Sequence, residues 1–149
     1  MLGVDPGKTT GWASYDTQAL AIAGAAQAPG NEFLDLVIPW VDACKGRDDV
    51  RIVAERFVIT GGTVEMGRTE ENWSIEQIGL LRHHARWAGL PFELQGAGDV
   101  KKFAPNERLR AIGWYVRGRE HANDALRHVL LNVARHHPEV LDQILSGVT

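Results

Sequence analysis

Apolar residues along the chain occur in short runs, typical of buried strands, and at helical spacing over longer stretches. The short runs predict strands at residues 2–4, 11–15, 19–26, 50–55 and 92–95. Apolar positions three or four residues apart predict a helix that begins near residue 31 and further helices at residues 71–88, 106–116 and 121–136. Strands first, then alternating strands and helices, indicate an α/β domain with a mixed sheet.

The predicted helices carry signals for their ends and their buried faces. Asn31 is expected to cap the first helix, in which Pro39 should produce a kink. Gly89 ends the helix at residues 71–88, whose inward positions are Ile75, Ile78, Leu81, Ala85 and Ala88. The helix at residues 106–116 should turn inward Leu109, Ile112 and Val116. The last helix is expected to bury Ala122, Ala125, Leu126, Val129, Leu130 and Val133.

Length and composition are those of one globular domain. The chain has 149 residues, of which 44% are hydrophobic and 23% are charged. No apolar run reaches the roughly 18 residues of a membrane span, and Asp5 lies where a signal peptide would be apolar. A lone cysteine, Cys44, excludes an internal disulfide and a cysteine-built zinc site. We therefore expect a single cytoplasmic domain over residues 1–149 that does not bind membranes.

Positive charge gathers in the last third of the chain. The formal net charge of −3 argues by itself against a nucleic-acid binder. The first 100 residues hold 8 Lys and Arg against 14 Asp and Glu, whereas the last 49 hold 8 against 5. A phosphate-binding surface and an ordinary solvated helix face both account for this distribution.

Three carboxylates lie beside predicted core residues. Asp5 ends the first apolar strand, Glu55 ends the central strand, and Asp124 lies in the first turn of an apolar helix. An unpaired charge in such a place costs several kcal/mol, so a cation or a metal should compensate it. Oxygen ligands of this kind suit Mg²⁺ or Mn²⁺. Each residue also has a structural explanation: an Asx turn for Asp5, an arginine partner for Glu55, and a favourable helix-start charge for Asp124.

One histidine shares a helix face with the third carboxylate. His121 lies three residues before Asp124, and His128 lies one turn further along. Adjacent histidine pairs at residues 83–84 and 136–137 point in different directions on a helix and make poor joint ligands. His121 is therefore the histidine that we consider as a ligand.

Four sequence blocks, in order, resemble the RuvC family of Holliday-junction resolvases. G-V-D-P-G at residues 3–7, followed by T-G-W-A at residues 10–13, resembles the opening of that family. V-A-E at residues 53–55 resembles its central-strand glutamate. G-L-P-F-E at residues 89–93 and V-K-K at residues 100–102 resemble its next strand and helix start. H-A-N-D-A-L at residues 121–126 resembles its final helix, so the resemblance covers nearly the whole chain.

The resemblance implies an RNase H-like fold, with a five-stranded mixed sheet and helices on both faces. It also implies a metal-dependent endonuclease, with a divergent phage-type member as one interpretation, that works as a homodimer in the cytoplasm of a prokaryotic or phage-infected cell. Such an enzyme cuts two strands of a four-way DNA junction and leaves 5′-phosphate and 3′-hydroxyl ends. The residues carried over as catalytic and as metal ligands are Asp5, Glu55, His121 and Asp124. They imply two Mg²⁺ ions per site, for which Mn²⁺ substitutes.

The residues expected to contact DNA depart in part from the family pattern. Lys101 and Lys102 match its V-K-K block and would neutralise phosphate charge. The loop that follows is shorter than in the family, so that its phosphate binding either falls to Arg108, Arg110, Arg117 or Arg119 or is reduced. Phe57 lies two positions after the strand glutamate, where the family has an aromatic at the third position that stacks on bases. A core role for Phe57 explains its presence equally well. The loop at residues 60–72 is acidic, which is unexpected beside DNA.

Other functions and the dimer contact also follow from these patterns. A nuclease that tolerates flaps and forks is the main alternative. D-P-G-K-T-T at residues 5–10 is similar to the phosphate hairpin of actin-like ATPases, but that fold needs a second domain and a second phosphate loop. A non-catalytic DNA-binding relative is disfavoured by the three carboxylates. The helix at residues 75–88, with Trp73 and Trp87 near its ends, is predicted to form part of the dimer interface.

Overall fold

The computed structural model describes residues 1–58 and 73–147. Within these residues, one sheet contains β1 (Leu2–Asp5), β2 (Thr9–Asp16), β3 (Ala21–Pro29), β4 (Ile52–Glu55) and β5 (Phe92–Gln95). The strands lie in the order β3-β2-β1-β4-β5. The first three pair antiparallel, whereas β4 is parallel to both β1 and β5. The predicted five-stranded mixed sheet is confirmed, and β1 lies at its centre.

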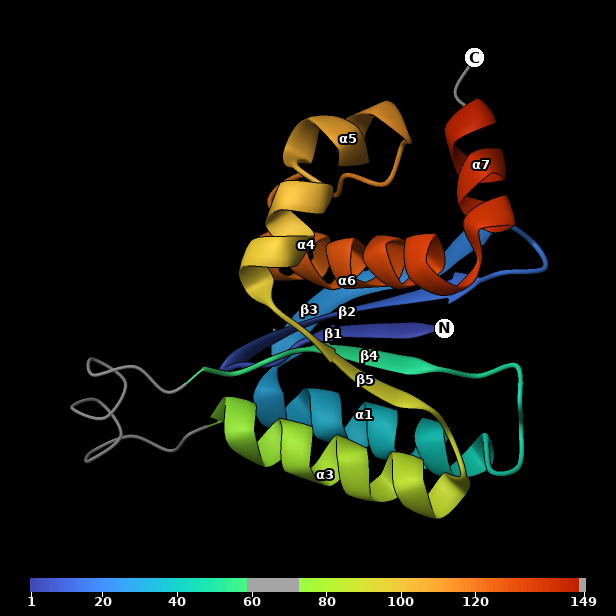
Figure 1. Cartoon of the computed structure of the whole chain (residues 1–149). Helices are drawn as coiled ribbons and strands as arrows, with labels where there is room; N and C mark the ends of the chain where they lie inside the picture. The colour runs from blue at the N-terminus through green and yellow to red at the C-terminus, as the bar shows by residue number, and fades with distance from the viewer. Residues whose placement is uncertain (59–72, 148–149) are drawn as a thin grey trace.

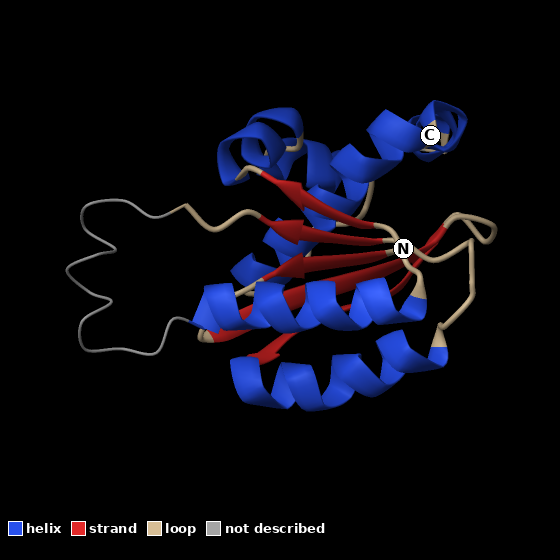
Figure 2. Ribbon diagram, turned by 60° about the horizontal axis from the view of Figure 1, so that its bottom comes forward, coloured by secondary structure: helices blue, strands red, loops and turns tan. Residues whose placement is uncertain are grey.

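Helices cover both faces of the sheet, as Figures 1 and 2 show. On one face, α1 (Gly30–Ala43) and α3 (Trp73–Ala88) lie side by side. On the other face, α6 (Glu120–His136) packs directly against β1, β2 and β4. Around α6 lie α4 (Ala97–Phe103), α5 (Asn106–Ala111) and α7 (Pro138–Ser146). Each face has its own hydrophobic core because alternate strand residues point to opposite sides.

Two glycines let α6 approach the sheet closely. A Cβ atom at Gly3 would lie 2.5 Å from the carbonyl oxygen of Ala125, and one at Gly11 would lie 1.9 Å from that of His121. No side chain fits at these distances, so both positions require glycine. Gly11 is paired with Asp5 in the β1–β2 register. The contact at Gly11 therefore brings the first turn of α6 to the end of β1.

The ends of several helices differ from the prediction. Pro29 is the N-cap of α1, so Asn31 lies inside the first turn and does not cap the helix. The helix continues through Pro39 to Ala43. Pro39 lies on the exposed side of the helix, so water can satisfy the carbonyl group that proline leaves without a hydrogen bond. α5 ends at Ala111 instead of residue 116, and the positive φ angles at Gly113 and Gly118 turn the chain that follows. α7 is an addition to the predicted elements.

The buried face of α3 also differs from the prediction. Leu81, Ala85 and Ala88 are buried as expected, but the predicted inward residue Ile75 is 45% exposed. Gln77 is fully buried in its place. A polar side chain occupies this inward position because it binds the loop after β1, as described below. The apolar face predicted for α6 is confirmed at each of its positions.

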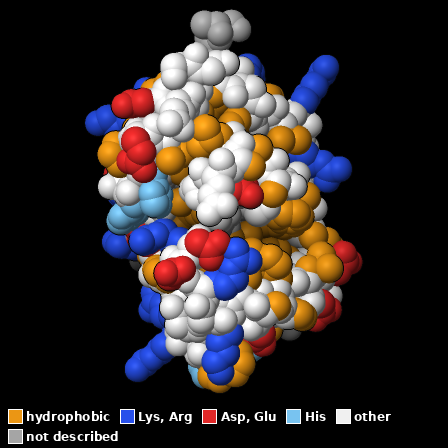
Figure 3. All heavy atoms as spheres, turned by 90° about the vertical axis from the view of Figure 1, so that its right-hand side faces the viewer, with side chains coloured by type: hydrophobic (Ala, Val, Ile, Leu, Met, Phe, Trp, Pro, Cys, Tyr) orange, Lys and Arg blue, Asp and Glu red, His pale blue; other side chains and the backbone are white. Residues whose placement is uncertain are grey.

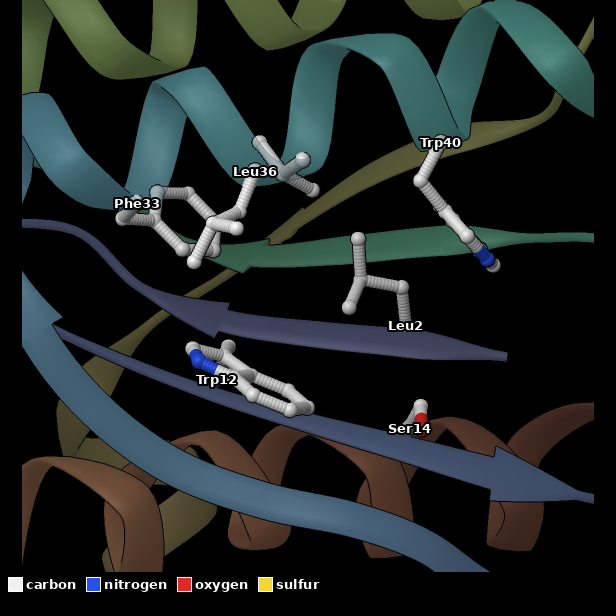
Figure 4. A pocket seen from close by; sticks show the side chains of 7 residues that line it. Leu2, Trp12, Ser14, Phe33, Leu36 and Trp40 are labelled. Carbon is white, nitrogen blue, oxygen red and sulfur yellow. The ribbon is translucent and has the colours of Figure 1, made fainter.

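Apolar side chains also remain on the surface, as Figure 3 shows for the face on the right of Figure 1. A hollow of about 350 Å³ lies between α1 and the strands β1 and β2 (Figure 4). Its lining includes Leu2, Trp12, Ser14, Phe33, Leu36 and Trp40. None of the described helices is long and apolar enough to cross a membrane.

Candidate active site

Two of the predicted carboxylates lie at the ends of neighbouring parallel strands. Val4 is in register with Ala54, and the next residues along the two strands are Asp5 and Glu55. Both side chains therefore reach the same edge of the sheet, at the carboxyl ends of its parallel strands. This edge is where open α/β sheets bind their ligands. The alternative role of Glu55 as the partner of an arginine finds no support among the described contacts, since its partner is a histidine.

His121 reaches this edge from the first turn of α6. Its Nδ1 atom lies 2.7 Å from Oδ2 of Asp5, which is buried, while the histidine itself is half exposed. Burial raises the pKa of Asp5 from 3.8 to about 6. The contact with His121 opposes this rise, and the nearby charges of Glu55 and Asp124 add to it. Glu55 and Asp124 are thus both close enough to Asp5 to repel its charge.

Asp124 lies one turn further along α6 and is held by two cations. Its Oδ2 atom is 3.2 Å from Nζ of Lys101, and its Oδ1 atom accepts a hydrogen bond from Nη1 of Arg127. Asp124 is thus more than a helix-start charge, because two other side chains fix its carboxylate. Lys101, which was predicted to contact phosphate, forms an ion pair with Asp124 in this structure.

Arg127 is a residue of the site that the sequence reasoning did not single out. Its guanidinium is nearly fully buried, donates from Nε to the carbonyl oxygen of Ala104 at 2.9 Å, and also bonds Oδ1 of Asn106. It therefore connects Asp124 to the junction between α4 and α5. The sequence feature that could have identified it is an arginine placed among the buried positions of an otherwise apolar helix.

Glu55 has a partner of its own on α6. Nε2 of His128 lies 3.5 Å from Oε2 of Glu55, and Nδ1 of the same ring lies 3.0 Å from Oε1 of Gln95. His128 is completely buried. The sequence placed His128 on the face of Asp124 but gave it no role.

A third element holds the turn that follows Asp5. The Gln77 amide of α3 donates to the carbonyl oxygen of Gly7 at 2.9 Å and accepts from the Gly7 amide at 3.2 Å. Thr10 donates to Oε1 of Gln77, and Ser74 donates to the carbonyl oxygen of Pro6, both at 2.9 Å. These contacts fix the turn from α3, on the opposite face of the sheet from α6. Sequence reasoning missed Gln77 and Ser74 because neither belongs to an apolar or charged pattern.

The donor set fits a divalent cation, although the side chains are not arranged as a closed metal site. Across residues 1–58 and 73–147, no three Asp, Glu, His or Cys side chains form a group that could hold a metal ion as they stand. The available donors are carboxylate oxygens and an imidazole, which bind Mg²⁺ and Mn²⁺. Burial, and to a smaller extent the charges of Glu55 and Asp124, raise the pKa of Asp5, and a bound cation would favour its ionised form. Lys101 and Arg127 now supply part of that positive charge at Asp124.

The basic residues predicted to contact DNA lie on the same side of the sheet as α6. Lys102 and four arginines are exposed along α4, α5 and the following loop: Arg108, Arg110, Arg117 and Arg119. Arg110 stacks over the ring of Tyr115 at 4.3 Å, and both border a shallow pocket with Arg117. Phe57 is half-buried just after β4, while Val58, at the third position, is 61% exposed. The acidic loop at residues 60–72 lies outside the described residues.

Strand order, parallel strand ends and the crossing helix define an RNase H-like α/β domain. Among solved structures, the chain is similar to Thermus thermophilus RuvC in complex with a Holliday junction substrate. The TM-score is 0.57, with 18% sequence identity over 92% of this chain and 97% of that chain. A second Thermus thermophilus RuvC structure matches with a TM-score of 0.53 and 17% identity over 91% and 96% of the two chains. The fold is therefore RuvC-like, as the sequence blocks predicted. No protein-family model and no curated protein matches the chain significantly.

Proposed function

We propose that this protein is a divalent-metal-dependent DNA endonuclease that resolves four-way junctions by paired nicking. One observation carries the proposal: Asp5 and Glu55 end adjacent parallel strands, and α6 brings His121 and Asp124 to the same edge. A buried carboxylate with a raised pKa, beside two further carboxylates at a sheet edge, favours a functional site over a purely structural one. The RuvC-like fold supports the proposal, because one structure with this fold is in complex with a Holliday junction substrate.

The proposed ligands of two Mg²⁺ ions, or of Mn²⁺ in their place, are Asp5, Glu55, His121 and Asp124. Bound divalent metal supplies a nucleophilic water at neutral pH and stabilises the charge that develops on the leaving oxygen. The residues of this chain then have separate tasks. Asp5 lies on the central strand of the sheet, within reach of the charges of both other carboxylates. Lys101 and Lys102 neutralise DNA phosphates at the neighbouring α4.

The proposed substrate and assembly follow from the same fold. A homodimer presents two such edges to the two strands of a branched DNA, and products carry 5′-phosphate and 3′-hydroxyl ends. The exposed residues Leu80 and Trp87, which share one face of α3, support the predicted dimer surface at residues 75–88. We place this activity in the cytoplasm of a prokaryotic or phage-infected cell.

The test is cleavage of labelled four-way, flap, fork and linear DNA with and without Mg²⁺. We expect Mg²⁺-dependent paired cuts in the four-way junction and no cleavage by Asp5→Asn. Asp35→Asn, which removes the same charge from the exposed side of α1, is the matched control and should cleave normally. Preferred cutting of flaps or forks would support the structure-tolerant nuclease instead. Binding without cutting would identify a non-catalytic DNA-binding protein. ATP hydrolysis without cutting would support the hypothesis of an actin-like ATPase.

A further inference from the structure

A histidine that the proposed reaction does not use is buried behind one of its carboxylates. His128 is fully buried in α6, one turn beyond Asp124, where most neighbouring positions are apolar. A polar ring in such a place is costly unless hydrogen bonds satisfy it. Its two nitrogens face Oε2 of Glu55 at 3.5 Å and Oε1 of Gln95 at 3.0 Å. The ring therefore lies between the ends of the neighbouring strands β4 and β5.

Gln95 fixes the orientation of this ring. Its Nε2 atom lies 3.3 Å from Oε1 of Glu93, and a carboxylate can only accept, so the amide nitrogen must point to Glu93. The amide oxygen is left to face His128. Glu93 is itself held by α6 through Asn132 at 2.8 Å and Arg135 at 2.9 Å. These contacts therefore link Glu93 and Gln95, both on β5, to His128 on α6.

Both oxygens that face the ring are hydrogen-bond acceptors. Oε2 of Glu55 can only accept, so the ring is placed to donate to it from Nε2. Asp5 and Asp124 have corresponding partners, since His121 contacts the first and Arg127 holds the second. Each of the three carboxylates is therefore contacted by one side chain of α6.

We propose that His128 is a positioning residue that holds the Glu55 carboxylate in the orientation needed for metal binding. This inference rests on the proposed function, because it assigns His128 a role toward a metal that Glu55 would bind. Hydrogen bonds to ligating carboxylates commonly change metal affinity by 10- to 100-fold. His128 acts through Glu55 and does not itself contact the metal or the DNA.

The test measures Mn²⁺ affinity of the whole protein by isothermal titration calorimetry, without DNA. We expect His128→Leu to weaken Mn²⁺ binding by about tenfold or more. His128→Gln keeps an amide donor near the position of Nε2 and should restore affinity to within about threefold of the wild type. Gln95→Met leaves His128 in place but removes its anchor, so it should fall between these two variants. Thermal melting of each variant shows that the folded protein is being compared.

Val133→Ala is the control for a structural effect. It also changes a fully buried side chain of α6, but Val133 lies in the apolar core around this helix and takes no part in the contacts from Glu93 to His128. We expect it to lower stability while leaving Mn²⁺ affinity unchanged. Wild-type affinity in His128→Leu, or an equal loss in Val133→Ala, would overturn the role of His128. In both of those cases Asp5→Asn still abolishes Mn²⁺ binding if the proposed function is right. A wild type that binds no Mn²⁺ would overturn the proposed function together with this inference.

Discussion

At Asp5, burial raises the pKa of the carboxyl group from 3.8 to about 6, and the charges of Glu55 and Asp124 contribute to the rise. Between about pH 4 and pH 6, the folded protein therefore holds a proton that the unfolded chain has released. The free energy of unfolding falls as the pH rises through this range. Above it, the ionised carboxylate costs about 3 kcal/mol of stability in the metal-free protein.

Asp5→Asn should stabilise the metal-free protein at pH 7.5, by about 1–3 kcal/mol, because the amide is neutral and nearly the same shape. The difference between variant and wild type should shrink to near zero at pH 4, where the carboxyl of Asp5 is protonated in the folded state. Urea unfolding at the two pH values measures both quantities. Equal stability of the two proteins at pH 7.5 would mean that the ionised carboxylate of Asp5 does not destabilise the folded protein.

The carboxylates of this site could be predicted from the sequence, but their partners could not. Asp5 and Glu55 interrupt apolar runs, and a charge at such a position is conspicuous. Arg127 and His128 occupy positions on α6 that periodicity alone assigns to the core or to the surface, with no indication of a partner. Their roles depend on which strand ends lie opposite, and that information comes from the packing of α6 against the sheet.

Among the secondary-structure elements, α6 determines where the site forms. Its first turn lies against β2 at Gly11, and its next turn lies against β1 at Gly3. These close contacts place His121 and Asp124 over the ends of β1 and β4. A change that lifts α6 from the sheet should therefore disturb the site even if it touches none of the predicted ligands.

Gly11→Ala should destabilise the protein by more than about 3 kcal/mol or abolish its folding, because its Cβ atom would overlap the carbonyl group of His121. Gly79→Ala is the matched control, since no atom lies within 4 Å of a Cβ atom at this position of α3. It should stabilise the protein by about 0.5–1 kcal/mol through helix propensity. Thermal melting of both variants decides the matter, and a harmless Gly11→Ala would refute the close packing of α6.

Elements with a strong apolar pattern could be predicted from the sequence. Helix ends and buried polar positions that depend on contacts with other elements could not. The strands and α6 follow from alternating or helical apolar spacing. α5 ends early because Gly113 and Gly118 adopt positive φ angles, which the apolar spacing of Ile112 and Val116 does not reveal. Gln77 interrupts the apolar face of α3 because it binds the backbone of the turn after β1. Only the assembled sheet and helices show that this turn lies within reach.

At the scale of the whole molecule, the two parts of the chain differ in charge: residues 1–100 are net negative and residues 101–149 are net positive. The last 49 residues are net positive within a protein whose net charge is −3. Lys102 on α4 and the exposed arginines of α5 and the following loop lie on the α6 side of the sheet. This distribution gives one face a local preference for phosphate that the net charge conceals.

Lys102→Ala should weaken binding to every DNA sequence and lower the slope of log affinity against log salt by about 0.9, the value for one phosphate contact. Lys45→Ala serves as the control, because Lys45 packs over the Trp87 ring at 3.8 Å, next to α1 and α3. Its salt dependence should equal that of the wild type. Fluorescence anisotropy at several salt concentrations measures the slopes, and an unchanged slope for Lys102→Ala would place the phosphate surface elsewhere.

The central claim is that side chains from β1, β4 and α6 form one metal centre, and anomalous diffraction from Mn²⁺-soaked crystals tests it most directly. The account predicts anomalous peaks bounded by Asp5, Glu55 and Asp124, with His121 beside them and Lys101 released from Asp124. Two ions should lie roughly 3.5–4 Å apart, the spacing of two-metal phosphodiester chemistry. Mn²⁺ bound away from these carboxylates, or no Mn²⁺ at all beside an intact Lys101–Asp124 pair, would contradict the account.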